Sequence, residues 1–360
     1  MFDPQEEHRI MRFADQFEFV IGVDTHKRTH AIAVVDTRGG VRMSARDTTD
    51  PAGIARLIDI AHADAPGPRL WAIEQTGSYG ASLAIELARR GELVVEIDRP
   101  SRPARRNGAK DDGLDAIRAA REALGREHLA CPRARGAREA LRVLVATRRA
   151  AMLARIAAIC QLKALVVTAP GELRESLRGL RTRELIRTCA RLHRMSVHDD
   201  ERRGTVLALR ATARRIEYLT LEQAELECEL ERLVRQERPE LLELVGVGVM
   251  VAAQVLVSWS HPGRVRSEAA FAAMAGVAPV PASSGEITRH RLNRSGDRQL
   301  NRAIHNIVLT RIRVDPLTQA YLARRQAEGR SLPEIKRCLK RTVVRQLFRF
   351  LERSPQSTAA

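Results

Sequence analysis

The chain has 360 residues, enough for two or three domains with buried cores. Its 61 Lys and Arg residues against 44 Asp and Glu residues give a net charge of +17, so a polyanion such as nucleic acid is the expected partner. Hydrophobic residues at 44% exclude a wholly disordered basic chain, and aromatic residues at 3% leave few platforms for base stacking. A GC-rich genome is an alternative source of part of the Arg content.

The cysteine pattern and the N-terminus indicate the compartment. Five cysteines are dispersed without a CxxC pair, which argues against a zinc site and against a disulfide framework. Residues 1–13 carry too many charges for a signal peptide, and no apolar run approaches the ~20 residues of a membrane span. We therefore expect a cytoplasmic protein that does not bind a membrane.

Residues 18–130, after an N-terminal extension at 1–17, alternate between strand and helix patterns. Strands are predicted at 19–24, 30–36, 41–45, 69–75 and 92–98, and helices at 51–61 and 82–90. Three strands in a meander followed by alternating strands and helices predict a mixed α/β sheet with covering helices, in the ribonuclease-H-like (RuvC-like) order.

Residues 131–238 are expected to form a helical spacer. Apolar residues recur by sevens at Val145, Met152, Ile159 and Val166, and a second series runs from Leu209 to Leu233. Two long helices are implied, with a break at Pro170-Gly171. Either they pack on each other as an antiparallel hairpin, or they form a coiled coil that joins protomers.

Residues 239–350 form a third, mostly helical domain, and 351–360 a frayed tail. Gly246 and Gly248 are predicted between two apolar helices, as in a helix-hairpin-helix element whose glycines let backbone amides approach a DNA phosphate. A plain helix-helix turn is the alternative. A loop over 279–296 precedes an amphipathic helix at 297–313.

Acidic residues form the first candidate site. Asp24 and Glu74 end two strands that lie side by side in a ribonuclease-H-like sheet, and Asp112 and Asp115 share one face of the next helix. Four converging carboxylates favour Mg²⁺ or Mn²⁺, and two such ions promote phosphoryl transfer. The alternatives are a turn-forming role for Asp24 and a helix-capping role for Asp111 and Asp112.

A serine and many cations form the second candidate site. Ser283 and Ser284 lie in the Gly- and Pro-rich loop, although such sequences are usually linkers. The residues expected to contact a phosphate backbone are Lys27, Arg102, Arg105, Arg106, Lys110, Arg289, Arg291, Arg294 and Arg298. Solvated surface charge is the alternative for each of them. The histidines show no HExxH motif, and His26 and His30 are interpreted as structural or surface groups.

Several motifs together resemble a known family. IGVDTHK, AIEQTGSYG, KDDGLDA, LVGVGVMVAAQVL and FAAMAGVAPVPASSGEITRHRLNRSGDRQLNRAIH are similar to the DEDD transposases of bacterial insertion sequences, the bridge-RNA-guided serine recombinases. The resemblance extends from Phe19 to about Arg313.

The resemblance implies roles for single residues. Asp24, Glu74, Asp112 and Asp115 match the metal-binding acids of the family, with Asp111 standing where the family has threonine, which leaves Asp111 an alternative third ligand. Ser284 matches the nucleophile, with Ser283 as the alternative.

The resemblance also implies the activity. We expect a Mg²⁺- or Mn²⁺-dependent enzyme that excises and inserts an element through a phosphoserine link to DNA. A noncoding bridge RNA would select donor and target DNA, and the protein would work as a dimer or tetramer. The alternatives are a metal-dependent Holliday-junction nuclease without serine chemistry and a non-enzymatic architectural protein.

Overall fold

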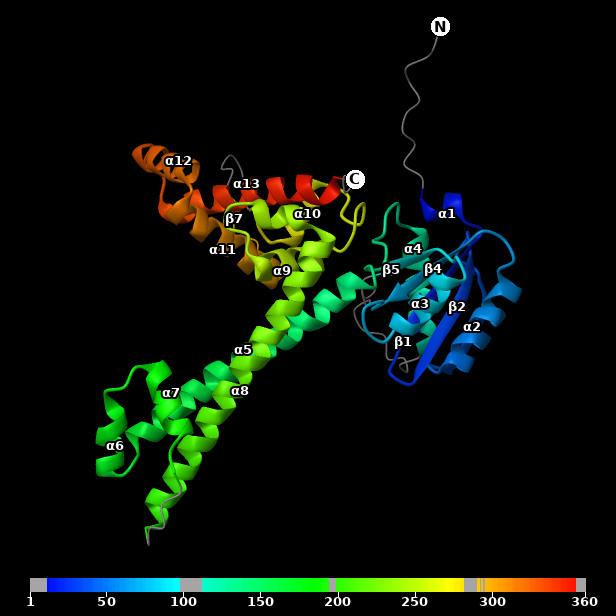
Figure 1. The fold of residues 1–360 in the computed structure, drawn as a ribbon. Helices are drawn as coiled ribbons and strands as arrows, with labels where there is room; N and C mark the ends of the chain where they lie inside the picture. The colour runs from blue at the N-terminus through cyan, green and yellow to red at the C-terminus, as the bar shows by residue number, and fades with distance from the viewer. Residues whose placement is uncertain are drawn as a thin grey trace, which may run out of the picture. The chain divides into compact units, whose positions relative to one another are not determined.

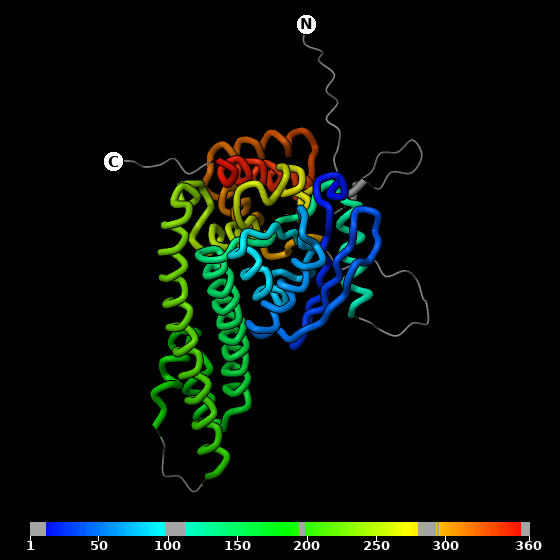
Figure 2. Tube along the Cα trace, turned by 90° about the vertical axis from the view of Figure 1, so that its right-hand side faces the viewer, coloured from blue at the N-terminus to red at the C-terminus, as the bar shows by residue number. Residues whose placement is uncertain are grey.

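The computed structural model describes residues 12–97, 112–193, 199–281, 290–291, 293 and 295–353 (Figures 1 and 2). The chain folds as two compact units, one ending at Arg133 and the other beginning at Ala134.

The first unit is built on a five-stranded mixed sheet. Its strands are β1 (Phe19–Thr25), β2 (Thr29–Asp36), β3 (Val41–Thr48), β4 (Arg69–Glu74) and β5 (Val94–Ile97). The strand order is β3-β2-β1-β4-β5, with β1 antiparallel to β2 and parallel to β4. The predicted meander and the predicted neighbourhood of the two acid-bearing strands, β1 and β4, are therefore confirmed.

Helices cover both faces of this sheet. The helices are α1 (Phe13–Gln16), α2 (Pro51–Asp64), α3 (Ala81–Arg89) and α4 (Asp112–Leu124). Because side chains alternate along a strand, Ile21 and Val23 pack with α2 and α3, whereas Val20 packs with α4. Residues of β1 with even numbers therefore face α4.

The second unit contains a long antiparallel helical pair, α5 (Ala137–Val167) and α8 (Asp200–Glu237) (Figure 2). Arg148 contacts Glu227 and Arg155 contacts Thr220, so residue numbers rise along α5 as they fall along α8. The short helices α6 (Gly171–Arg178) and α7 (Thr182–Ala190) connect the pair. The two predicted long helices are confirmed, and they pack on each other as a hairpin within one chain.

Helix α5 is the most apolar long helix among the described residues, although Arg155 and Lys163 interrupt its apolar sequence. It is long and apolar enough to cross a bilayer, with a mean hydropathy of 1.8 over its most apolar window. Length and composition alone are weak evidence, since core helices pass the same test.

The C-terminal part of this unit packs around one end of the pair. Its elements are η1 (Pro239–Glu243), α9 (Val249–Trp259), α10 (Glu268–Met274), β6 (Val280–Pro281), β7 (His290–Arg291), α11 (Arg298–Val314), α12 (Pro316–Ala327) and α13 (Leu332–Glu352). Their shared core includes Phe271, Ile304 and Leu347, together with Leu141 of α5 and Leu230 of α8. The start of α5 and the end of α8 are thus anchored in the C-terminal core.

Candidate active site

Asp24 comes near the end of β1, directly after a run of buried residues. Its even number places it on the α4 face of the sheet with Val20 and Gly22. Only 11% of its side chain is exposed. A carboxylate this buried needs charged or polar partners.

Gly22 allows α4 to approach that strand closely. A Cβ atom on Gly22 would lie 2.0 Å from the carbonyl oxygen of Ala116 and 2.5 Å from the backbone nitrogen of Ala120. The backbone of α4 therefore rests directly on β1. Asp112, one turn before Ala116, is thereby placed above Asp24.

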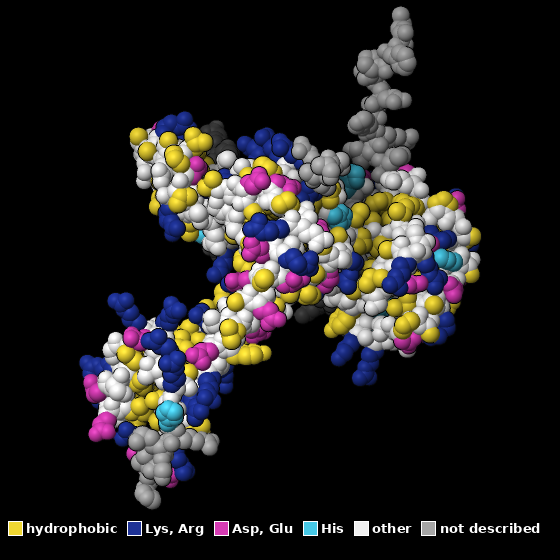
Figure 3. Space-filling model, in the orientation of Figure 1, with side chains coloured by type: hydrophobic (Ala, Val, Ile, Leu, Met, Phe, Trp, Pro, Cys, Tyr) yellow, Lys and Arg dark blue, Asp and Glu magenta, His cyan; other side chains and the backbone are white. Residues whose placement is uncertain are grey.

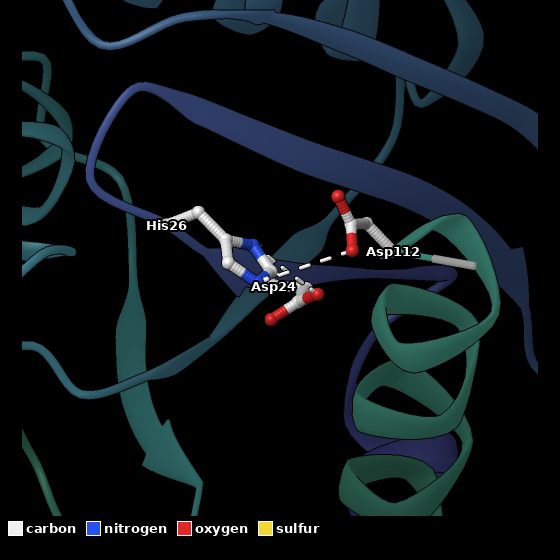
Figure 4. A group of neighbouring side chains, drawn as sticks. All are labelled: Asp24, His26 and Asp112. Atoms are coloured by element: carbon white, nitrogen blue, oxygen red, sulfur yellow. Dashed lines mark ion pairs between the residues drawn. The ribbon is translucent and has the colours of Figure 1, made fainter. Parts of the chain in front are cut away.

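Asp24, His26 and Asp112 form a group of possible metal ligands (Figure 4). One ligand atom from each lies within 4.8 Å of the others. His26 Nδ1 is 3.6 Å from Asp24 Oδ2, and His26 Nε2 is 3.9 Å from Asp112 Oδ1. Across the described ranges, this is the one such group of three or more.

Glu74 and Asp115, the other two predicted acids, lie nearby but outside that group. Glu74 ends β4, one residue past the paired Val23 and Ile73, and its even number also places it on the α4 face. Asp115 is on the first turn of α4 and forms an ion pair of 2.6 Å with Arg118.

The sequence did not predict His26 as a member of this group, because His26 was interpreted as a structural or surface residue. It follows β1, and its imidazole lies within ion-pair distance of both aspartates (Figure 4). Its Nδ1 is buried and has no hydrogen-bond partner in the part of the chain that the structure describes. The signal available in the sequence was its position two residues after Asp24.

Charged neighbours complete the electrostatics of the group. Arg46 Nη2 lies 3.3 Å from Asp112 Oδ2 and partly neutralises that carboxylate. His30, the other histidine interpreted as a structural or surface group, is fully buried. Its burial and the nearby His26 both lower the pKa of His30. We expect His30 to be neutral near pH 7.

The donor set fits a divalent cation. Two carboxylates are the hard oxygen ligands that Mg²⁺ and Mn²⁺ accept, and an imidazole suits Mn²⁺ better than Mg²⁺. The Nδ1 of His26, which contacts Asp24 at 3.6 Å without a hydrogen bond, is the kind of buried polar atom that a bound ion would satisfy. Arg46 would have to release Asp112 for that carboxylate to bind an ion.

Two family models match this chain. One is described as "Transposase" and named for the DEDD transposase of IS110; it matches residues 21–169, which include all three members of the group. The other, "Transposase IS116/IS110/IS902 family", matches residues 238–323. The two matches lie in the order that the sequence motifs predicted, and together they span well over half of the chain.

The chain belongs to the IS110/IS116/IS902 family of transposases. It is 33% identical over 114 residues to the "Insertion element IS110 uncharacterized 43.6 kDa protein" of Streptomyces coelicolor, a stretch that covers 31% of this chain and 28% of the relative. It is 35% identical over 103 residues to the "Insertion element IS900 uncharacterized 42 kDa protein" of Mycobacterium paratuberculosis, covering 28% and 26%. The alignments thus span about a quarter of each relative.

The Gly-Val-Gly segment of this IS110-family chain differs from the prediction. A five-residue 3₁₀ turn, η1, precedes it where an apolar α-helix was expected, so that part of the prediction is wrong. Gly246 has φ +84°, and a Cβ there would lie 3.0 Å from the carbonyl oxygen of Ile307. Gly248 is the N-cap of α9. Gly246 therefore serves close packing on α11, whereas the position of Gly248 at a helix start still allows a phosphate contact.

Many predicted nucleic-acid contacts lie outside the described residues. These are Arg102, Arg105, Arg106, Lys110, Arg289 and Arg294, together with Asp111, Ser283 and Ser284. Of the others, Lys27 lies in the exposed turn after His26, Arg291 is in β7, and Arg298 begins α11.

Further cations surround the end of the helical pair that carries α6 and α7, seen as dark blue side chains in Figure 3. They include Arg178 and Arg203, whose side chains are 72% and 67% exposed. The positive charge of this family member is therefore not confined to the predicted contacts.

Proposed function

We propose that this chain excises and inserts an insertion-sequence element by DNA strand exchange. The observation that carries the proposal is the meeting of Asp24 and Asp112 on one face of the sheet, inside the region that matches the DEDD transposase model. The ribonuclease-H-like (RuvC-like) fold belongs to the same proposal, and the strand order β3-β2-β1-β4-β5 supports it.

Asp24, Glu74, Asp112 and Asp115 are the proposed ligands of Mg²⁺ or Mn²⁺, and His26 is added to them by its position. A cation held there would stabilise negative charge on a phosphodiester. Asp24 and Asp112 would bind the cation directly. Because Asp24 is buried, its electrostatic attraction to the cation would be stronger than at a solvent-exposed position.

Ser284 is the proposed nucleophile. Its hydroxyl would lose a proton and attack phosphorus, forming a phosphoserine bond while a DNA hydroxyl leaves. Gly276 and Gly296, which flank the serine-bearing segment in the sequence, have φ of +64° and +96°. The backbone N–H of Asp297 donates to the carbonyl oxygen of Met274 at 2.7 Å, so the chain before the serine-bearing segment and the chain after it lie close together.

The proposed partners are donor and target DNA, a noncoding guide RNA from the element, and further copies of the chain in a dimer or tetramer. The net charge of +17 supports a large nucleic-acid interface. The low aromatic content supports a protein that contacts backbone and shape and leaves sequence recognition to base pairing.

The decisive experiment is a strand-exchange assay with the purified chain, its guide RNA, and donor and target DNA. Ser284→Ala should abolish both exchange and the covalent protein–DNA adduct seen on a denaturing gel, whereas Ser283→Ala should retain both. Full exchange by Ser284→Ala with loss in Ser283→Ala would move the nucleophile to Ser283. Exchange by both variants would exclude serine chemistry.

Asp24→Asn tests the acidic site in the same assay. Exchange should fall by at least ~100-fold, the scale of losing a metal-based contribution to phosphoryl transfer, while nucleic-acid binding stays within about twofold. Junction cleavage without any adduct would favour the Holliday-junction nuclease. Full activity of Asp24→Asn would favour a binding protein without catalysis.

A further inference from the structure

A basic cavity lies in the C-terminal part of the second unit. Its volume is about 1170 Å³, above the usual range for small-ligand pockets, ~300–1,000 Å³. The turn after α10, the start of α11, the end of α12 and one side of α13 form its walls. Of the described residues, seven Lys and Arg side chains line it, against two carboxylates, Asp297 and Glu334.

Both carboxylates are engaged in capping helices. Asp297 accepts hydrogen bonds from the backbone of Gln299 and Leu300 at the start of α11. Glu334 accepts from the backbone and hydroxyl of Ser331 at the start of α13. Neither forms an ion pair with a cavity cation among the described residues, so the cavity keeps an excess of positive charge.

The cations divide into two groups. Arg341 and Arg345 share Glu268, and Arg325 pairs with Glu328. The remaining four cations, Arg298, Arg330, Arg337 and Lys340, have no carboxylate within 4.0 Å in the described part of the chain.

Lys340 is the most informative of these four. It is partly buried, and its Nζ donates to Asn301 Oδ1 at 2.9 Å, so its partner is a neutral amide. Asn301 Nδ2 donates to Ala275 O at 2.7 Å, which fixes the amide with its oxygen toward the lysine. Burial lowers the pKa of Lys340. An ammonium group has three N–H donors, so this one retains the capacity to bind an anion.

A neighbouring histidine reflects the positive charge of this part of the chain. His305, one turn after Asn301 on α11 but outside the cavity wall, has a buried Nδ1 without a hydrogen-bond partner among the described residues. Its pKa is lowered by burial and by the charges of Lys340 and Lys336. Burying a cation without a counter-charge costs free energy, and a bound anion would offset that cost.

We propose that this cavity binds the phosphodiester backbone of a nucleic-acid strand, with Lys340 in its wall and Arg298 and Arg337 as further phosphate ligands. The inference rests on the proposed function for the kind of polyanion. The cavity inference also goes beyond the proposed function, because α13, which carries Lys340 and Arg337, lies past the end of the family match at residue 323. Contacts of this kind fix position and carry no sequence information.

The test is binding of the full chain to fluorescein-labelled duplex DNA and to a hairpin RNA with the same number of phosphates, by anisotropy between 50 and 300 mM salt. Lys340→Gln and Arg337→Gln should each lower the slope of log K against log salt by about one. At 0.15 M salt that corresponds to a roughly five- to tenfold weaker binding. Lys340→Arg should restore most of the loss.

Arg232→Gln is the matched control, since Arg232 is exposed on α8, pairs with Glu229 and is absent from the cavity wall. Cavity variants that bind both probes as Arg232→Gln does would overturn the proposal. If Lys340→Gln unfolds the chain, the binding of Arg337→Gln tests the proposal, because Arg337 is exposed and its substitution should leave the fold intact. A loss confined to one probe identifies the strand as DNA or RNA and supports the cavity.

A second measurement uses the lysine itself. Mass spectrometry of the acetylated chain should show that nucleic acid protects Lys340 from an amine-acylating reagent, and equal acylation with and without nucleic acid would count against the site. Failed strand exchange with intact cavity-dependent binding would overturn the proposed function alone. Failure of the unmodified chain to bind either probe would overturn both.

Discussion

Gly22 shows how one residue positions the acidic site. Its missing Cβ lets the backbone of α4 contact β1, and this contact places Asp112 beside Asp24. Gly22→Ala should therefore destabilise the first unit by about 1–3 kcal/mol through overpacking, and should weaken Mn²⁺ binding. Urea unfolding and a Mn²⁺ titration measure the two effects.

Gly204→Ala is the control for that variant. Gly204 lies within α8, and a Cβ there meets nothing within 4 Å. Alanine at an open helical position should stabilise the chain by about 0.5–1 kcal/mol. Equal stability of Gly22→Ala and the unmodified chain would mean that α4 does not depend on this contact.

The acidic site was partly predictable at the residue scale. Asp24 was recognisable because a charged residue near the end of a buried strand is unusual, and Asp112 because it opens a helix that had to cover the sheet. His26 was not recognised, because its approach to Asp112 depends on how the turn after β1 folds against α4. That geometry is set by tertiary packing, which residue spacing does not express.

At the scale of elements, helix α5 presents an apolar face that is exposed within the described residues of its own unit. The face, which we call the α5 stripe, has eight exposed positions spaced alternately by three and four: Val143, Ala146, Ala150, Leu153, Ala157, Cys160, Ala164 and Val167. The heptad residues noted in the sequence, such as Val145 and Ile159, are instead half-buried. Periodicity predicted the helix, but it could not tell which face contacts α8.

The α5 stripe predicts how copies of the chain associate. Its spacing is that of a coiled-coil seam, and it contains no charged residue. Leu153→Glu should place like charges in such a seam and weaken self-association by at least tenfold, as measured by mass photometry over a concentration series.

Leu221→Glu is the matched control for association. Leu221 is 71% exposed on α8 and lies outside the stripe. The substitution Leu221→Glu introduces the same charge as Leu153→Glu and should leave the oligomeric state unchanged. An equal loss in both variants, or none in Leu153→Glu, would remove the α5 stripe from the interface.

At the scale of the whole molecule, the candidate metal-binding residues and the candidate phosphate-binding residues belong to different units. The candidate metal ligands belong to the first unit, whereas the basic cavity belongs to the second. The two units have separate hydrophobic cores: two clusters on the two faces of the sheet in the first unit, and two clusters among the helices of the second. A ligand that binds one unit should therefore stabilise that unit selectively.

The two tryptophans of the chain make this selectivity measurable. Trp71 is buried in the sheet of the first unit, and Trp259 is buried at the end of α9 in the second. Each indole donates a hydrogen bond to a glutamate, Glu92 and Glu352 respectively. Trp259→Phe leaves fluorescence that reports on the first unit, and Trp71→Phe leaves fluorescence that reports on the second.

Mn²⁺ should raise the melting temperature of the first unit and leave that of the second within about a degree. At a concentration 100 times the dissociation constant, a single bound ion adds about 2.7 kcal/mol, which is several degrees for a unit of this size. Asp112→Asn in the Trp259→Phe background should abolish the shift, because it removes one of two carboxylates that face His26. Arg46→Gln should enlarge it, since Arg46 competes with the ion for Asp112. A shift of the Trp259 signal alone, or an undiminished shift in Asp112→Asn, would place the cation elsewhere and separate the acidic group from the chemistry.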